Sequence, residues 1–260
     1  MSSTEHSASA SVMATLRSQY TFQISVDVDR IALGLSVAEA ALKGGVHLVE
    51  MGTPLLKCEG VHNVVPAFRS RFPEALLLAD MKTMDGGAFE AQAVYEGGGN
   101  IIDFLALAGI ASAREICAVR DEFRRNDPSM ARLAFADILV PHQGPADRAI
   151  AVALEMLDTG VDGVGLHLQL DARRADAALF QSGYLASVAE AVFRRVGDAA
   201  SVQVVGGLTT TQAVGLAKVG LRAFVISGNM GLDDGSARYT SPPEEIERLV
   251  AGFIAEVSAA

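Results

Sequence analysis

The sequence is poor in the features that define several large classes of protein. It has 260 residues, no tryptophan and two cysteines, Cys58 and Cys117, so we expect free thiols instead of a disulfide framework. Acidic residues outnumber basic ones by 31 to 21, which argues against a general nucleic-acid binder. No apolar run reaches the roughly 18 residues of a membrane span. These absences favour a cytoplasmic protein with neither nucleic acid nor membrane as a partner.

The first 19 residues differ in composition from the rest of the chain. They are rich in serine and alanine, and they lack the basic start and apolar centre of a secretory signal. We expect residues 1–19 to form a flexible, loosely held N-terminal extension. No linker divides residues 20–260, which we expect to form a single domain with a sizeable core.

Short apolar runs alternate with stretches of helical composition over residues 20–260. The runs fall at 22–28, 46–51, 75–81, 100–107, 132–140, 162–168, 201–207 and 221–227. Apolar strands separated by helices predict a parallel sheet covered by helices. A helix that ends in glycine precedes the second, fourth, sixth and eighth runs, at a spacing of roughly 55–60 residues. Four such pairs without a linker favour a closed (β/α)8 TIM barrel.

Polar residues at the carboxyl ends of the predicted strands are the candidates for chemistry, because barrel enzymes place their sites there. Two of them, Asp80 and Lys82, are two residues apart and should share one face of a strand. A structural ion pair would explain two charges, but not the whole set. We expect Asp103 and Asp137 to be structural, and His167 is either a proton carrier or a hydrogen-bonded core histidine. The full set is Asp27, Glu50, Asp80, Lys82, Asp103, Asp137 and His167.

Four motifs suggest a known family. The stretch "LADMKTMDGG" (78–87) resembles the D-x-K-x-x-D signature of the orotidine monophosphate decarboxylase superfamily. The stretches "VEMGTPLLKCEG" (49–60), "VDGVGLHLQLD" (161–171) and "VVGGLT" (204–209) are similar to the 3-hexulose-6-phosphate synthase family in particular. The resemblance runs from about Phe22 to Gly231. It implies a homodimeric barrel and a reversible, Mg²⁺-dependent aldol condensation of formaldehyde with ribulose 5-phosphate.

The resemblance also implies roles for individual residues, and their chemistry is consistent with those roles. Mg²⁺ is expected to bind Glu50 and Asp80, because magnesium prefers oxygen ligands and keeps positions open for an enediolate. Lys82 would stabilise the developing oxyanion, and His167 would carry the proton. Asp27 corresponds to an acid that contacts substrate hydroxyls.

Asp85 lies just beyond the third predicted strand, before Gly86 and Gly87. The resemblance implies that this acid crosses a two-fold axis into the partner subunit's site. The alternative is that Asp85 only caps the helix that follows, a common role for aspartate.

Phosphate recognition is expected in the loops after the seventh and eighth strands, through backbone N–H groups and a helix N-terminus. Asp233 and Asp234 follow the second of these loops and would repel phosphate if they faced it. The arginines of "DARRAD", Arg173 and Arg174, are expected on a solvated segment. The predicted phosphate-binding residues are Gly206, Gly207, Gly228 and Asn229.

Other functions remain open at this point. A 3-keto-L-gulonate-6-phosphate decarboxylase would share the enediolate, but that group carries an arginine three residues after the histidine, where this chain has Leu170. A related enzyme that acts on another sugar phosphate is a second alternative. A noncatalytic sugar-phosphate binder is a third, although a binder has no need of Lys82 beside a pair of metal ligands.

Overall fold

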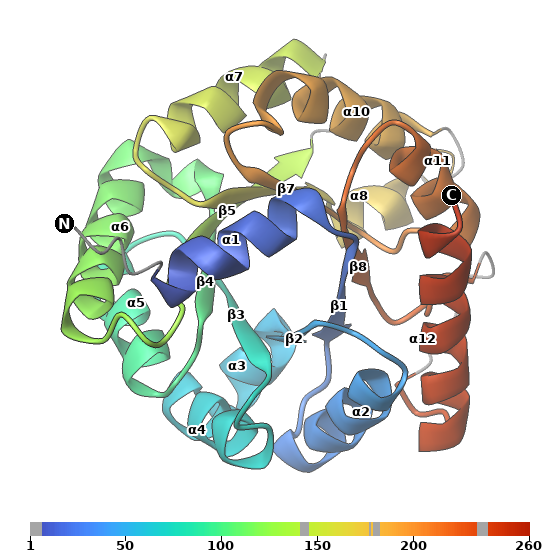
Figure 1. Cartoon of the computed structure of the whole chain (residues 1–260), viewed down its shortest axis with the longest axis horizontal. Helices are drawn as coiled ribbons and strands as arrows, with labels where there is room; N and C mark the ends of the chain where they lie inside the picture. Colours follow the sequence, from blue (N-terminus) through green and yellow to red (C-terminus); the bar gives the residue numbers. More distant parts are fainter. Residues whose placement is uncertain (1–6, 141–145, 177, 179–182, 233–238) are drawn as a thin grey trace, which may run out of the picture.

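The chain folds around a parallel barrel. A computed structural model describes residues 7–140, 146–176, 178, 183–232 and 239–260. Its eight strands pair in chain order, and β8 closes the barrel against β1 (Figure 1). The expected (β/α)8 TIM barrel is therefore confirmed, and each strand overlaps the apolar run that predicted it. The strands are β1 (Thr21–Val26), β2 (Leu48–Met51), β3 (Leu76–Thr83), β4 (Ile101–Leu105), β5 (Leu133–Val140), β6 (Gly163–Leu168), β7 (Ser201–Val205) and β8 (Ala223–Ile226).

Helices surround the barrel and follow its strands. Before β2, β4, β6 and β8 the chain turns through Gly45, Gly98, Gly160 and Gly220, whose φ angles of 93° to 106° favour glycine. No helix in the described part of the chain is both long and apolar enough to cross a membrane. The helices are α1 (Ala8–Ser18), α2 (Ile31–Lys43), α3 (Thr53–Glu59), α4 (Val61–Arg71), α5 (Gly87–Glu96), the 3₁₀ helix η1 (Ala106–Ala108), α6 (Gly109–Asn126), α7 (Ala146–Leu157), α8 (Leu170–Ala175), α10 (Tyr184–Val196), α11 (Thr210–Lys218) and α12 (Pro243–Ser258).

Two apolar cores stabilise the barrel. The larger one joins the helices to the outward-facing side chains of the strands. The smaller one lies inside the barrel toward the amino-terminal ends of the strands, and its strand residues are Leu48, Leu78, Ile101, Leu133 and Phe135. Because side chains alternate along a strand, β2, β3, β4 and β5 supply residues to both cores.

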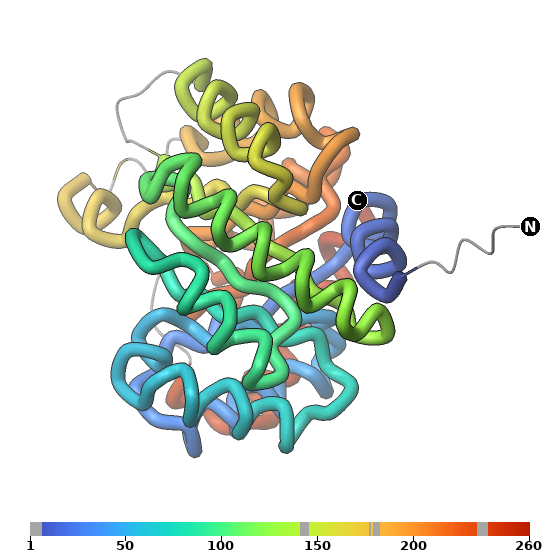
Figure 2. Tube along the Cα trace, turned by 90° about the vertical axis from the view of Figure 1, so that its left-hand side faces the viewer, coloured from blue at the N-terminus to red at the C-terminus, as the bar shows by residue number. Residues whose placement is uncertain are grey.

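Helix α1 closes the amino-terminal end of the barrel. Its Leu16 is buried in the interior core, with Val12 and Met13 packed beside it on the same helical face. The hydroxyl of Ser9 donates to the carbonyl of Arg132 at 3.3 Å and accepts from its N–H at 3.0 Å. The expected loose extension is therefore wrong for residues 8–18, because this apolar face has a partner inside the barrel. Figure 2 shows α1 at one end of the molecule and α8 at the other.

Candidate active site

A polar layer lies above the apolar interior, toward the carboxyl ends of the strands. In the parallel register Glu50 lies opposite Leu78, Asp80 opposite Asp103, and Asp137 opposite Leu105 and Gly165. Asp80 is two residues beyond Leu78, so it faces the same interior one layer higher. The barrel therefore changes from leucine to carboxylate within two residues of the same strand.

Lys82 connects two of these acids. Its Nζ lies 2.5 Å from Oδ1 of Asp80 and 2.8 Å from Oδ2 of Asp137. Burial alone would lower the pKa of Lys82, but the carboxylates of Asp137 and Asp80 raise it above its ordinary value. Lys82 is therefore a permanent cation in the middle of the acids.

The backbone at Lys82 departs from a regular strand. Its φ is +49°, and the pairing of β3 with β4 shifts register between Asp80 and Thr83. A left-handed non-glycine residue costs about 1–3 kcal/mol and persists only where its surroundings hold it. Asp80 and Lys82 do meet, as their spacing predicted, but they meet through this irregular turn and its ion pairs.

His167 is held by Asp137. Its Nδ1 lies 3.1 Å from Oδ2 of Asp137, the same oxygen that binds Lys82. Burial opposes ionisation of Asp137, but Lys82 and His167 lower its pKa to about 2. A carboxylate on Nδ1 fixes the ring and leaves Nε2 to exchange a proton. Asp137, which was expected to be structural, thus lies in direct contact with both candidate catalytic groups.

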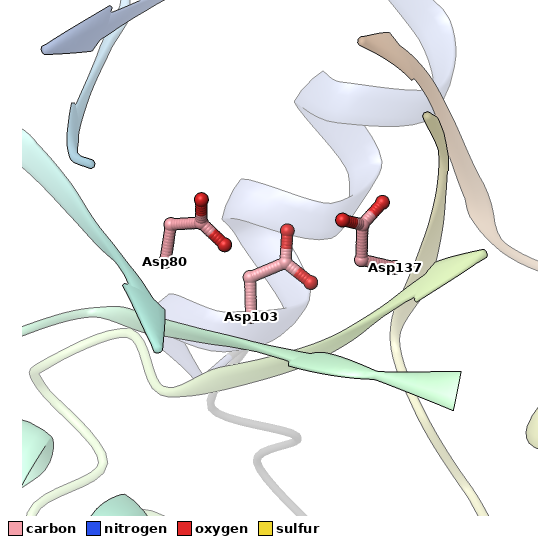
Figure 3. Close-up of side chains that lie close together, drawn as sticks. All are labelled: Asp80, Asp103 and Asp137. Atoms are coloured by element: carbon pink, nitrogen blue, oxygen red, sulfur yellow. The ribbon is translucent and has the colours of Figure 1, made fainter. Parts of the chain in front are cut away.

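Asp103 belongs to the same cluster. One carboxylate oxygen from each of Asp80, Asp103 and Asp137 lies within 4.8 Å of the others (Figure 3). Burial and the nearby Asp137 raise the pKa of Asp103 well above its ordinary value. Oδ1 of Asp103 and Oδ1 of Asp137 are buried and have no hydrogen-bond partner among the described residues. Their strand-end positions were the sequence signal for this cluster, and the structural role expected for both stays a prediction.

Glu50 is buried beside the three aspartates, although it is not part of their 4.8 Å group. Its Oε2 accepts from Nε2 of Gln23 at 2.5 Å, and its Oε1 accepts from Oγ of Ser25 at 3.0 Å. Burial and the charge of Asp80 raise the pKa of Glu50 well above its ordinary value. No motif in the sequence indicated Gln23 or Ser25, which orient this carboxylate.

The donor set fits a hard divalent cation. Glu50, Asp80, Asp103 and Asp137 offer only carboxylate oxygens, the ligand type that Mg²⁺ prefers. Lys82 neutralises only part of their negative charge, and two buried oxygens lack partners among the described residues. The predicted ligand pair, Glu50 and Asp80, stays a prediction, with Asp103 and Asp137 as further oxygen donors nearby.

Two loops shape the rim of this site. Oδ2 of Asp27 accepts from Oγ of Ser25 at 3.1 Å and from the hydroxyl of Tyr239 at 3.2 Å. Thr53, at the start of α3, donates its hydroxyl to Oδ2 of Asp80 at 2.7 Å. A Cβ on Gly52 would collide with the Asp27 carboxylate, so the glycine before Thr53 is required sterically. No sequence pattern indicated these contacts of Thr53 and Tyr239.

The predicted phosphate loops are brought together by Asn229. Its Nδ2 donates to the carbonyls of Gly207 at 3.1 Å, Leu208 at 3.3 Å and Leu232 at 3.1 Å. Asn229 therefore braces the two loops with its amide. Gly228 packs against the ring of Tyr239. Asp233 and Asp234 lie outside the described residues.

Arg173 and Arg174 differ in environment. Arg174 is exposed, as expected for a solvated segment. Arg173 is half-buried, and its Nη1 donates to the carbonyl of Gly206 at 2.7 Å. The expectation is therefore wrong for Arg173, because α8 folds back toward the end of β7.

Asp85 lies outside the cluster of its own chain. It is exposed, and its Oδ1 accepts from the N–H of Gly86 at 2.8 Å. Helix α5 has Gly86 at its N-cap and no side-chain cap. The capping alternative is therefore not the arrangement that forms.

Comparison with known proteins identifies the family. The fold and the site define a TIM barrel with a buried, charged site at its strand ends, the end that barrel enzymes use. Residues 20–191 match the family described as orotidine 5'-phosphate decarboxylase / HUMPS. The chain belongs to this family.

Individual relatives fall into two groups. The 3-hexulose-6-phosphate synthase of Methylomonas aminofaciens is 27% identical over 135 residues, 52% of this chain and 58% of the relative. A probable 3-keto-L-gulonate-6-phosphate decarboxylase of Mycoplasma pneumoniae is 28% identical over 101 residues, 38% of this chain and 46% of the relative. The chain thus spans about half the length of these relatives. A crystal structure of 3-hexulose-6-phosphate synthase superposes with a TM-score of 0.71 at 22% identity, over 90% of this chain and 99% of that one.

Proposed function

We propose that this chain is a Mg²⁺-dependent lyase of the 3-hexulose-6-phosphate synthase type, which condenses formaldehyde with ribulose 5-phosphate or catalyses the reverse reaction. The observation that carries the proposal is the contact chain Asp80–Lys82–Asp137–His167, which joins a permanent cation to a proton carrier. Relatives named as synthase and decarboxylase support the same class of sugar-phosphate chemistry.

The chemistry follows from these contacts. His167 removes a proton from the carbon next to the substrate carbonyl, and the electrons move onto the carbonyl oxygen to form an enediolate. Lys82 stabilises the negative charge that develops on oxygen. The enediolate carbon then attacks formaldehyde, which restores the carbonyl, and the new alkoxide takes up the proton held by His167. Mg²⁺, held by Glu50 and Asp80, would polarise the carbonyl and orient the reacting oxygens.

A turnover assay tests the reaction. Formaldehyde consumption is measured with ribulose 5-phosphate, with and without EDTA, and release of formaldehyde is measured from the hexulose phosphate. We expect turnover in both directions that stops on chelation and returns with added Mg²⁺. Absence of formaldehyde chemistry with this pair would reject the synthase proposal.

The metal ligands are tested by Glu50→Gln, with the exposed Glu256→Gln variant as the control for the loss of one negative charge. Glu50→Gln keeps the size and shape of the side chain but removes a charge, so most Mg²⁺-dependent activity should be lost while the circular dichroism spectrum is unchanged. Full activity at limiting Mg²⁺ would remove Glu50 from the metal site.

Two other functions are distinguished by testing further sugar phosphates for turnover and for binding. A decarboxylase would release CO₂ from 3-keto-L-gulonate 6-phosphate, and relatives with that name are the observation in its favour. Leu170, three residues after His167, favours the synthase instead. A noncatalytic binder would bind these sugar phosphates without turning any of them over.

We also propose that the chain forms a homodimer through the face around Asp85. Among the described residues, four of the five large exposed hydrophobic side chains flank this position. They lie on neighbouring segments, because β3 pairs with β4 and α5 packs on α6. Such a patch is typical of a protein–protein interface. The four are Met84 (54% exposed), Phe89 (71%), Leu107 (65%) and Ile110 (40%).

A mixing experiment tests whether Asp85 acts in the partner's site. Asp85→Ala and Lys82→Ala chains are each expected to be inactive. With shared sites, a mixed dimer has one site with both changes and one intact site, so activity should rise toward about a quarter of wild type for random pairing. No recovery after proven subunit exchange would show that Asp85 serves its own chain.

A further inference from the structure

Arg173 carries a positive charge to the end of β7. It lies in α8, and its Nη1 donates to the carbonyl of Gly206 at 2.7 Å. A Cβ on Gly207 would lie 2.5 Å from the same nitrogen, so the guanidinium lies directly against this glycine. Gly206 and Gly207 have φ angles of +118° and +73°, a conformation that favours glycine in both places. The turn is thus shaped to accept this side chain.

The position of this turn relates it to the charged cluster. Val205 pairs with His167 across β6 and β7, and Gly206 is the next residue. Neighbouring strands are about 4.8 Å apart, so the Arg173 guanidinium is held one strand away from the proton carrier. A ligand whose carbonyl end lies at His167 and Lys82 would have its other end near Arg173.

In the predicted phosphate loops, the side-chain amide of Asn229 is already used within the protein. The Asn229 amide is engaged by the carbonyls of Gly207, Leu208 and Leu232. Helix α11 begins directly after the glycine turn, and Thr209 and Gln212 form its capping box. Its N-terminus adds a partial positive charge on the same side, but a formal charge comes from Arg173.

We propose that Arg173 binds the phosphate group of the substrate and so selects phosphorylated over unphosphorylated sugars. The inference rests on the proposed sugar-phosphate lyase function. A guanidinium matches phosphate geometry and can donate two parallel N–H bonds to it. The Gly206 carbonyl orients the guanidinium, so Arg173 supplies the site with a cation in a fixed position.

Direct binding tests the proposal without relying on turnover. Ribulose 5-phosphate, ribulose and inorganic phosphate are titrated by calorimetry into wild type, Arg173→Ala, Arg173→Lys and Arg174→Ala. Arg173→Ala should weaken binding of ribulose 5-phosphate and of phosphate by about 10- to 150-fold, the effect of losing hydrogen bonds to a charged group. Binding of ribulose should not change.

Three controls accompany this measurement. Arg173→Lys should recover part of the loss, added guanidinium should rescue Arg173→Ala, and Arg174→Ala should match wild type.

The outcomes separate this proposal from a purely structural role and from the proposed function. If Arg173 only secures the turn, Arg173→Ala will weaken ribulose and ribulose 5-phosphate equally, and guanidinium will not rescue it. Equal affinities of wild type and Arg173→Ala for inorganic phosphate would also overturn the proposal. If phosphate binding depends on Arg173 but no formaldehyde chemistry is found, the phosphate site stands and the lyase function fails.

Discussion

The two ends of the barrel interior are built from the same strands and have opposite properties. At the amino-terminal end, Leu48, Leu78 and Leu133 meet Leu16 of α1 in a closed apolar core. At the carboxyl end, Asp80 and Asp137 surround Lys82. The change takes two residues along β3, roughly 7 Å at the rise of a strand. The barrel thus combines an apolar layer with a charged layer, the proposed site of chemistry, and a substitution should affect mainly one of them.

The energetics of the two layers differ in sign. Burial of leucine side chains stabilises the fold by roughly 1.5–3 kcal/mol each. Burial of carboxylates opposes folding unless cations or hydrogen bonds compensate. The raised pKa values of Glu50 and Asp103 indicate that compensation is incomplete at the carboxyl end. We infer that this end is maintained for chemistry at some expense of stability.

The largest expected effect is on chemistry at the carboxyl end. His167→Asn removes the group that we propose carries the proton and keeps a polar side chain in its place. Exchange of the carbon 1 proton of ribulose 5-phosphate with deuterated solvent should slow by about 10²–10⁴-fold, followed by NMR. The exposed His62→Asn variant is the control. An unchanged exchange rate would remove His167 from the mechanism and weaken the contrast between the two ends.

The next effect is on stability at the amino-terminal end. Leu16→Ala opens a cavity under the barrel and should lower the free energy of unfolding by about 2–5 kcal/mol. Because Leu16 lies in the layer away from the acids, kcat/KM should stay within about two-fold of wild type at temperatures where the variant is folded. Chemical denaturation measures the first quantity and the turnover assay the second. The exposed Leu170→Ala should cause little loss of stability.

A stable Leu16→Ala variant would show that α1 is dispensable for the barrel. A variant that stays folded but loses activity would show that the two layers are coupled, which would contradict the comparison.

The smallest expected effect is a gain in folding stability at the carboxyl end. The folded-state pKa of Asp103 is raised above its ordinary value by burial and by Asp137. Ionisation therefore favours the unfolded state once the pH exceeds the ordinary aspartate pKa of about 3.9. Asp103→Asn should be more stable than wild type at pH 7 in EDTA, and the difference should disappear as the pH falls toward 3.9. Urea denaturation across this range measures it.

The exposed Asp29→Asn variant is the control for the loss of one negative charge. Equal stability of Asp103→Asn and wild type at pH 7 would mean that the Asp103 carboxylate is compensated in the folded protein.

Much of this architecture could be predicted from local sequence patterns. Apolar runs with glycine before every second strand indicated a closed eight-stranded barrel, because the strands must be covered by helices on one side and by each other's side chains on the other. The carboxyl ends of these runs placed Glu50, Asp80 and His167 at strand ends, and period-two alternation put Asp80 and Lys82 on one face. These features follow from local composition and from its repetition along the chain, so the sequence by itself determined them.

Only the tertiary structure decided which of these groups touch. Asp137 meets Lys82 and His167 because β5 lies beside β6 and the irregular end of β3 turns the lysine inward. The apolar face of α1 looked like a loose extension until the barrel interior provided its partner, and Arg173 looked solvated until α8 approached Gly206. Each of these contacts joins residues far apart in the chain, and it forms only when closure of the barrel fixes their distance.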